Sequence, residues 1–70
     1  MGKFVLKDDF IKLGQVLKAV RLADSGAEAK EIILEGKVRV NGEVCLQRGK
    51  KLVEGDKVTL DSETIEIVKS

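Results

Sequence analysis

The sequence predicts an α+β domain in which a helix-turn-helix-like pair packs on a small antiparallel sheet. Apolar residues at three- and four-residue steps over residues 10–20 predict a first helix, and a capping pattern at Ser25 predicts a second. After Gly36, short alternating segments separated by turns predict strands. The expected order is β-α-α-β-β-β-β. A length of 70 residues suits a single domain, to which we assign residues 1–70.

The N-terminal part of the chain predicts a strand followed by a helix. Residues 3–7 form a short apolar run that suits a strand. Asp8 or Asp9 can then cap the helix by accepting a hydrogen bond from a free amide of its first turn. The polar side chains of this helix fall on the half of the helical wheel opposite its apolar residues. They are Lys12, Gln15, Lys18 and Arg21.

The second predicted helix begins at Ser25 and ends before Gly36. Ser25 and Glu28 have the spacing of a capping box, in which each side chain accepts a hydrogen bond from the other residue's backbone amide. Gly36 stands where a left-handed residue commonly follows a helix. Because only a few residues connect the two helices, we expect them to pack against each other.

The rest of the chain predicts β structure. Asn41-Gly42 is a favoured two-residue hairpin turn, because both residue types tolerate a positive φ. Residues 47–51 form a basic loop, and residues 52–53 are extended. The strands expected from the alternation of polar and apolar residues are 37–40, 43–46, 57–60 and 64–68.

The composition excludes several classes of function. The chain has no His and one Cys, which excludes a Cys/His zinc site, an internal disulfide and nucleophilic catalysis that depends on His. No segment has the apolar length of a membrane span or the pattern of a signal peptide. We therefore expect a cytoplasmic monomer that is not an enzyme and that needs no cofactor and no metal ion.

The charge is nearly balanced as a sum but not along the chain. The formal net charge is +1, yet residues 1–51 hold 11 basic and 7 acidic residues, whereas residues 52–70 hold 2 and 5. A small protein with one basic side can bind a polyanion despite a neutral total. The alternative is that the charges cluster by chance on an ordinary soluble surface.

Recognisable motifs extend over residues 12–60. The pattern G-x-V-x-V-N-G begins at Gly36, and G-D-x-V begins at Gly55. The predicted helices add further matches, namely Lys12-Leu13, Leu17, Ser25, Glu28-Ala29-Lys30 and Ile33. Together these residues resemble the S4-type RNA-binding domain. Residues 11–15, 42–44 and 48–52 are most similar to the small bacterial proteins that consist of little besides this domain.

The resemblance implies an S4-like fold with its αL motif and a non-enzymatic protein that binds structured RNA, often ribosomal RNA. Two positions depart from the family pattern. Gly26 stands where family members often carry Arg, and Lys12-Leu13-Gly14 stands where many have Arg-Leu-Asp. Lys12 keeps the positive charge but lacks the planar fork of Arg, and Gly26 can still present its amide at a helix N-terminus.

The scarcity of aromatic residues predicts how RNA would be bound. Phe4 and Phe10 are the only aromatic residues, and we expect both in the core. Modules for single-stranded RNA stack bases on exposed rings, so we expect contacts to the phosphates and shape of a folded RNA instead. The candidate RNA-binding residues are Lys12, Gln15, Lys18, Arg21, Ser25, Gly26, Lys30, Lys37, Arg39, Asn41, Arg48, Lys50 and Lys51.

These candidates also have structural explanations as helix-surface, capping, turn or strand-face residues. Gly14, within the first helix, is better explained as a packing point between the helices than as a site of RNA approach. The loop at residues 48–51 is harder to explain structurally, because its three positive charges repel one another.

The sequence leaves two other functions open. V-N-G-E followed by G-D-x-V also resembles β-grasp sulfur carriers, which act through a C-terminal Gly-Gly, whereas this chain ends in Val68-Lys69-Ser70. A protein-interaction module is the other alternative.

Overall fold

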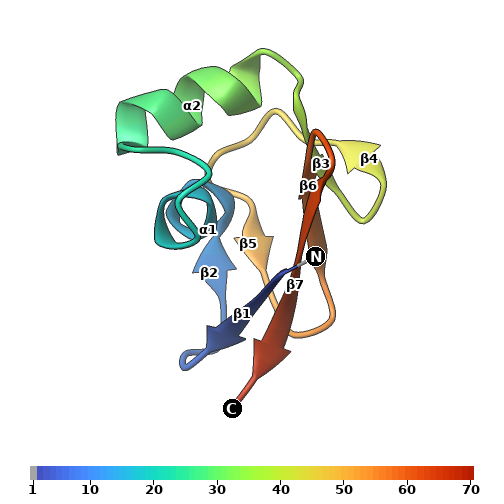
Figure 1. Ribbon diagram of the computed structural model, residues 1–70. Helices are drawn as coiled ribbons and strands as arrows, with labels where there is room; N and C mark the ends of the chain where they lie inside the picture. Colours follow the sequence, from blue (N-terminus) through green and yellow to red (C-terminus); the bar gives the residue numbers. More distant parts are fainter. Residues whose placement is uncertain (1) are drawn as a thin grey trace.

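The computed structural model describes residues 2–70 and shows two helices beside a sheet (Figure 1). The elements are β1 (Gly2–Leu6), β2 (Ile11–Lys12), α1 (Leu13–Ala19), α2 (Gly26–Leu34), β3 (Val38–Val40), β4 (Glu43–Val44), β5 (Lys51–Leu52), β6 (Lys57–Leu60) and β7 (Glu63–Lys69). The predicted α+β class and the predicted order of its elements are confirmed. The structure adds the two-residue strands β2 and β5, which pair with each other outside the main sheet.

The main sheet has five strands in the order β1-β7-β6-β3-β4. The pairs β3–β4, β3–β6 and β6–β7 are antiparallel. β1 instead pairs in parallel with β7, from Gly2 opposite Ile65 to Leu6 opposite Lys69, which differs from the wholly antiparallel sheet that we expected. A parallel pair needs a long connection, and here everything between β1 and β7 supplies it.

Helix α1 begins later than predicted, and neither Asp8 nor Asp9 caps it. Lys12 is the capping residue, with an extended backbone. The chain from Ile11 to Lys12 is a strand because it pairs with β5. The first turn is completed partly by Gln15, whose side-chain oxygen accepts a hydrogen bond from the Lys12 amide at 3.3 Å.

The predicted start and end of α2 are largely confirmed. Ser25 Oγ accepts a hydrogen bond from the Glu28 amide at 3.2 Å, as a capping residue should. The reciprocal bond is displaced by one residue, because the Glu28 carboxylate accepts from the Asp24 amide and not from that of Ser25. Gly36 has a φ of +77° immediately after the helix cap, as predicted.

The hairpin between β3 and β4 has the predicted turn. Asn41 and Gly42 both have positive φ, +54° and +87°. The Asn41 side chain also ties this turn to the segment before β6: its Nδ2 donates to Asp56 Oδ1, and its Oδ1 accepts from the Lys57 amide, both at 3.0 Å. β4 ends at Val44, two residues earlier than predicted, where the chain leaves the sheet.

The core lies between the helices and one face of the sheet. Its fully buried members come from both layers: Leu13, Val16, Leu17, Ile33, Val38, Leu52, Val58 and Ile67. Phe4 packs partly buried against this core. Phe10 was expected in the core as well, but the residue is 39% exposed. The pairing of β2 with β5 is the reason, because it removes Phe10 from the helical pattern that would have buried it.

Candidate nucleic-acid interface

Several predicted site residues meet in a groove between α1, the start of α2 and the loop at residues 45–50. We call it the helix–loop groove. Its volume is about 320 Å³. The lining residues are Lys12, Gly14, Gln15, Lys18, Gly26, Arg48 and Gly49. Five of the thirteen candidates, from segments far apart in the sequence, therefore share one hollow.

Backbone hydrogen bonds hold the basic loop against the start of α1. The Leu13 amide donates to the Lys50 carbonyl oxygen at 2.9 Å, and the Gly14 amide donates to the Arg48 carbonyl oxygen at 3.0 Å. These amides open the helix and have no partner within it, so the loop serves as the cap that Asp8 or Asp9 was predicted to provide. The bonds fix the backbone of Arg48 and Lys50 beside the polar side of α1.

Gly14 packs against this loop rather than between the helices, which corrects our expectation for it. A Cβ atom at Gly14 would lie 3.6 Å from the Arg48 carbonyl oxygen and 3.7 Å from its Cβ. A small residue at this position therefore lets the loop lie close along the helix.

Two lysines face each other at the edge of the groove. Lys12 and Lys51 occupy directly opposite positions in the β2–β5 pair, where like charges are destabilising. Within residues 2–70 one salt bridge is present, between Lys37 and Glu35 at 3.6 Å, so no carboxylate forms an ion pair with either lysine or with Arg48. A bound anion would relieve this repulsion.

The N-terminus of α2 adds to the positive potential of the groove. Gly26 is the first residue of this nine-residue helix and is exposed. A Cβ at Gly26 would have no neighbour within 4 Å, so the approach to the backbone is open. Helix N-termini carry a partial positive charge and free amides that favour anions. The groove therefore combines three cationic side chains, those of Lys12, Lys18 and Arg48, with a helix N-terminus.

Other predicted residues lie elsewhere. Arg39 is exposed between the buried Val38 and Val40, so strand alternation places it on the sheet face away from the core. Lys37 and Arg39 line a separate hollow of about 330 Å³ with Thr59 and Asp61. Arg21 was predicted on the polar side of the first helix, but it lies beyond the helix end with a φ of +64°. Arg21, Lys30 and the cap Ser25 are exposed and do not line the helix–loop groove.

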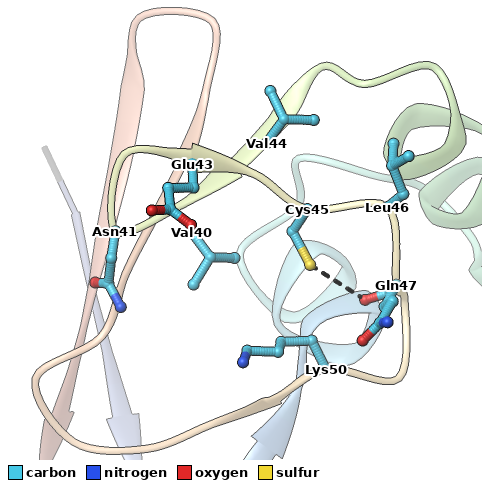
Figure 2. A pocket seen from close by; sticks show the side chains of 8 residues that line it. All are labelled: Val40, Asn41, Glu43, Val44, Cys45, Leu46, Gln47 and Lys50. Atoms are coloured by element: carbon cyan, nitrogen blue, oxygen red, sulfur yellow. Dashed lines mark hydrogen bonds between the residues drawn. The ribbon is translucent and has the colours of Figure 1, made fainter.

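Lys50 and Asn41 line a third hollow, between β4 and the loop. Its volume is about 520 Å³, and Figure 2 shows the Lys50 side chain extended along it toward Asn41. The remaining lining residues are Val40, Glu43, Val44, Cys45, Leu46 and Gln47. Cys45 Sγ lies 3.7 Å from the Gln47 carbonyl oxygen, which closes the turn of the chain after β4.

Sequence reasoning missed one residue beside the groove. Phe10 has the Lys51 ammonium 4.8 Å from the centre of its ring. Phe10 fits a helical apolar pattern, which predicts burial. Its exposure could have been predicted only from the pairing of residues 11 and 12 with residues 51 and 52.

Within the described residues, no three His, Cys, Asp or Glu side chains gather as metal ligands would. Neither helix of residues 2–70 has the length and apolar character needed to cross a membrane.

Comparisons with known proteins agree on one family. A family model described as the S4 domain matches residues 4–68. An Escherichia coli K12 protein named "Putative RNA-binding protein YbcJ" is 35% identical over 69 residues, covering 97% of this chain and 99% of that protein. A Bacillus subtilis 168 protein named "Probable ribosome maturation protein RlbA" is 42% identical over 53 residues, or 76% of this chain and 75% of that protein.

A solved structure has a similar fold. The solution structure of YbcJ from E. coli, described as revealing an αL motif involved in RNA binding, aligns with a TM-score of 0.74 at 35% identity. The alignment covers 97% of this chain and 87% of the other. The similarity therefore includes the helix pair, the loop and the sheet.

Proposed function

Because the chain belongs to the S4 domain family, we propose that it is a non-enzymatic protein that binds structured RNA, with ribosomal RNA as its target. The observation that carries the proposal is the helix–loop groove, where cations without ion-pair partners meet the N-terminus of α2. The names of the two relatives, which refer to RNA binding and to ribosome maturation, agree with this target. Family membership also favours this function over the β-grasp sulfur carriers.

The groove suits phosphate better than base edges. Arg48 can donate two parallel hydrogen bonds to one phosphate, while Lys12 and Lys18 supply point charges beside it. The first amides of α2, at Gly26, can receive a second phosphate. Lys51, opposite Lys12, extends the contact along the β2–β5 pair. Phosphates spaced along a folded RNA backbone are the ligand that this set of donors fits.

The remaining candidates have secondary roles in this proposal. Arg21, Lys30 and Lys50 lie outside the groove and contribute positive charge to the long-range attraction for RNA. The neutral Ser25 contributes only a hydrogen bond to a phosphate or a 2′-hydroxyl. Lys37, Arg39 and Asn41 belong to the sheet side of the molecule, and we expect them to contribute less.

Paired charge reversals test the proposal. Lys12→Glu with Arg48→Glu should lower affinity for bacterial ribosomal RNA and for a hairpin of about twelve base pairs by at least about 30-fold, measured by fluorescence anisotropy. Lys37→Glu with Arg39→Glu makes the same change in net charge on the sheet face and should lower the affinity for RNA by less than about threefold. The affinity of the unmodified protein should fall with salt at a log–log slope of about −3 to −6.

Two results would contradict the proposed surface. Equal losses in the two double variants would mean that net charge alone governs binding. A loss confined to the Lys37/Arg39 variant would move the RNA surface to the sheet. Circular dichroism spectra of both variants serve as the control for folding.

Exposed apolar residues favour the protein-interaction alternative as a second function. Leu34, Val44 and Leu46 are each more than half exposed. A pull-down of the tagged protein from a bacterial lysate, with and without RNase, separates the two functions: RNA binding predicts that captured proteins are lost after RNase, and a direct protein contact predicts that they persist.

A further inference from the structure

A fourth hollow lies beside the helix–loop groove, and the proposed phosphate contacts do not use it. Its volume is about 500 Å³. It is lined mainly by residues of β1 and of the segment before α1: Phe4, Val5, Leu6, Lys7, Asp8, Phe10, Ile11 and Gln15. Gln15 lines both hollows, so the two are adjacent. We propose that this hollow binds one unpaired nucleobase, stacked on Phe10, next to the phosphates held in the groove.

Phe10 is the residue that a base would contact. Phe10 as a residue is 39% exposed, in a chain whose only other aromatic residue packs against the core. Burial therefore does not explain an aromatic residue at this position. Every nucleobase has a flat apolar face, and exposed rings in positively charged grooves are the usual platforms on which unpaired bases stack.

The neighbouring cation distinguishes a nucleotide from a purely apolar ligand. The Lys51 ammonium lies 4.8 Å from the centre of the Phe10 ring but does not line the hollow. Lys51 therefore lies over the ring, and the proposed base stacks where Phe10 borders the hollow, with Lys51 near enough to pair with a phosphate of the same nucleotide. Lys7 lines the hollow and supplies a second charge.

Polar groups in the lining can bind the edge of a base. The side-chain oxygen of Gln15, Oε1, already accepts a hydrogen bond from the Lys12 amide. The two N–H donors of the same side chain therefore remain for a ring nitrogen or a carbonyl oxygen of the base. The Asp8 carboxylate accepts hydrogen bonds and suits an amino group of a base. The hollow thus offers an apolar platform, a donor and an acceptor, which are the features of a site for a heteroaromatic ligand.

This inference rests on the proposed RNA-binding function, and its test separates the two. The probe is tetra-adenylate, a single-stranded RNA of four nucleotides, titrated into the isotope-labelled protein and followed by NMR. Stacking should shift the ring signals of Phe10 and the methyl signals of Val5 and Ile11. Tripolyphosphate, which has charge but no base, should shift the amide signals of Gly26 and Gly49 only.

Substitutions make the test quantitative. Phe10→Leu keeps an apolar side chain and should weaken tetra-adenylate binding by about 5- to 150-fold while leaving tripolyphosphate binding unchanged. Phe10→Trp should retain binding, and because the chain has no other Trp, quenching of its fluorescence reports on this site alone. Leu34→Trp is the matched control: Leu34 is 58% exposed and lies outside the hollow, so its fluorescence should not change.

Three results would overturn the inference. If tetra-adenylate shifts the groove amides but not Phe10, phosphate binding stands and the base site does not exist. Equal affinity of Phe10→Leu and the unmodified protein, with thermal unfolding showing both folded, would also refute stacking. If N-acetyl-leucine amide shifts the Phe10 signals and tetra-adenylate does not, the hollow receives an apolar side chain of a protein instead.

Discussion

The β3–β4 hairpin, taken as residues 37–44, and the helix–loop groove both carry polar side chains. The two regions differ in what these side chains bind. In the hairpin, Lys37 pairs with Glu35, and Asn41 binds Asp56 and the Lys57 amide. In the groove, Lys12 faces Lys51 across a strand pair, and neither forms a salt bridge. In the hairpin, Lys37 and Asn41 therefore bind other parts of the chain, whereas in the groove Lys12 has no carboxylate partner and is available to a ligand.

The comparison also separates two kinds of information in the sequence. The most recognisable motif, G-x-V-x-V-N-G, lies in the hairpin and encodes a helix end, a buried strand and a turn. The groove depends on residues such as Arg48 that belong to no compact pattern. A motif that identifies a family can thus report on folding, while the proposed binding surface is formed by the residues around it.

The largest expected effect is at the hairpin turn. Asn41→Ala removes two side-chain hydrogen bonds and places Ala at a positive φ, so the free energy of unfolding should fall by about 2 kcal/mol. Urea unfolding measures this change. Affinity for RNA should stay within about twofold, and a clear loss of affinity with unchanged stability would make Asn41 a binding residue. Asn41→Gly should lower the free energy of unfolding by less, because glycine adopts a positive φ without strain.

An intermediate effect is expected at the cap of α2. Ser25→Ala removes the acceptor for the Glu28 amide and should cost about 1 kcal/mol. Ser25→Asp keeps a capping oxygen but adds a negative charge beside the groove, so stability should hold while RNA affinity falls by about fivefold. Unchanged RNA affinity in Ser25→Asp would place the phosphates away from the α2 N-terminus.

The smallest effects should have opposite signs in the two regions. Lys12→Met relieves the repulsion with Lys51 and should raise the free energy of unfolding by about 0.2–1 kcal/mol, at the expense of RNA affinity. Lys37→Met breaks an exposed ion pair and should lower stability by about 0–1 kcal/mol without affecting RNA. Salt at about 0.5 M should reduce both changes in the free energy of unfolding, because it screens the charges. Destabilisation by Lys12→Met would mean that this lysine is already compensated within the protein.

Local signals predicted the local structure well. The Ser25 cap, the left-handed Gly36 and the Asn41-Gly42 turn each depend on neighbouring residues, and each is present. The charge division along the chain singled out the loop at residues 48–51, and the role of this loop in binding stays a prediction. Of the candidate site, the placement of Gln15 and Lys18 on one side of α1 followed from helical periodicity alone, whereas Lys12, predicted with them, is the extended cap residue before the helix.

Contacts between distant segments could not be predicted in this way. The start of α1 at Leu13 depends on carbonyl oxygens of residues 48 and 50, which no pattern near the helix encodes. The exposure of Phe10 follows from the same pairing, because without β5 the residue fits the helical period. The sheet position of Arg39 separated it from the groove, although both belong to the basic part of the chain.

The parallel pairing of β1 with β7 has a consequence for how the protein forms during synthesis. β1 leaves the ribosome before its partner β7 is made, so β1 has no hydrogen-bonding strand until residues 63–69 emerge. The helix pair and the β3–β4 hairpin are built from near neighbours in the chain and can form earlier. The edge of the sheet is therefore completed late in folding, and the wall that β1 contributes to the hollow beside Phe10 forms at the same stage.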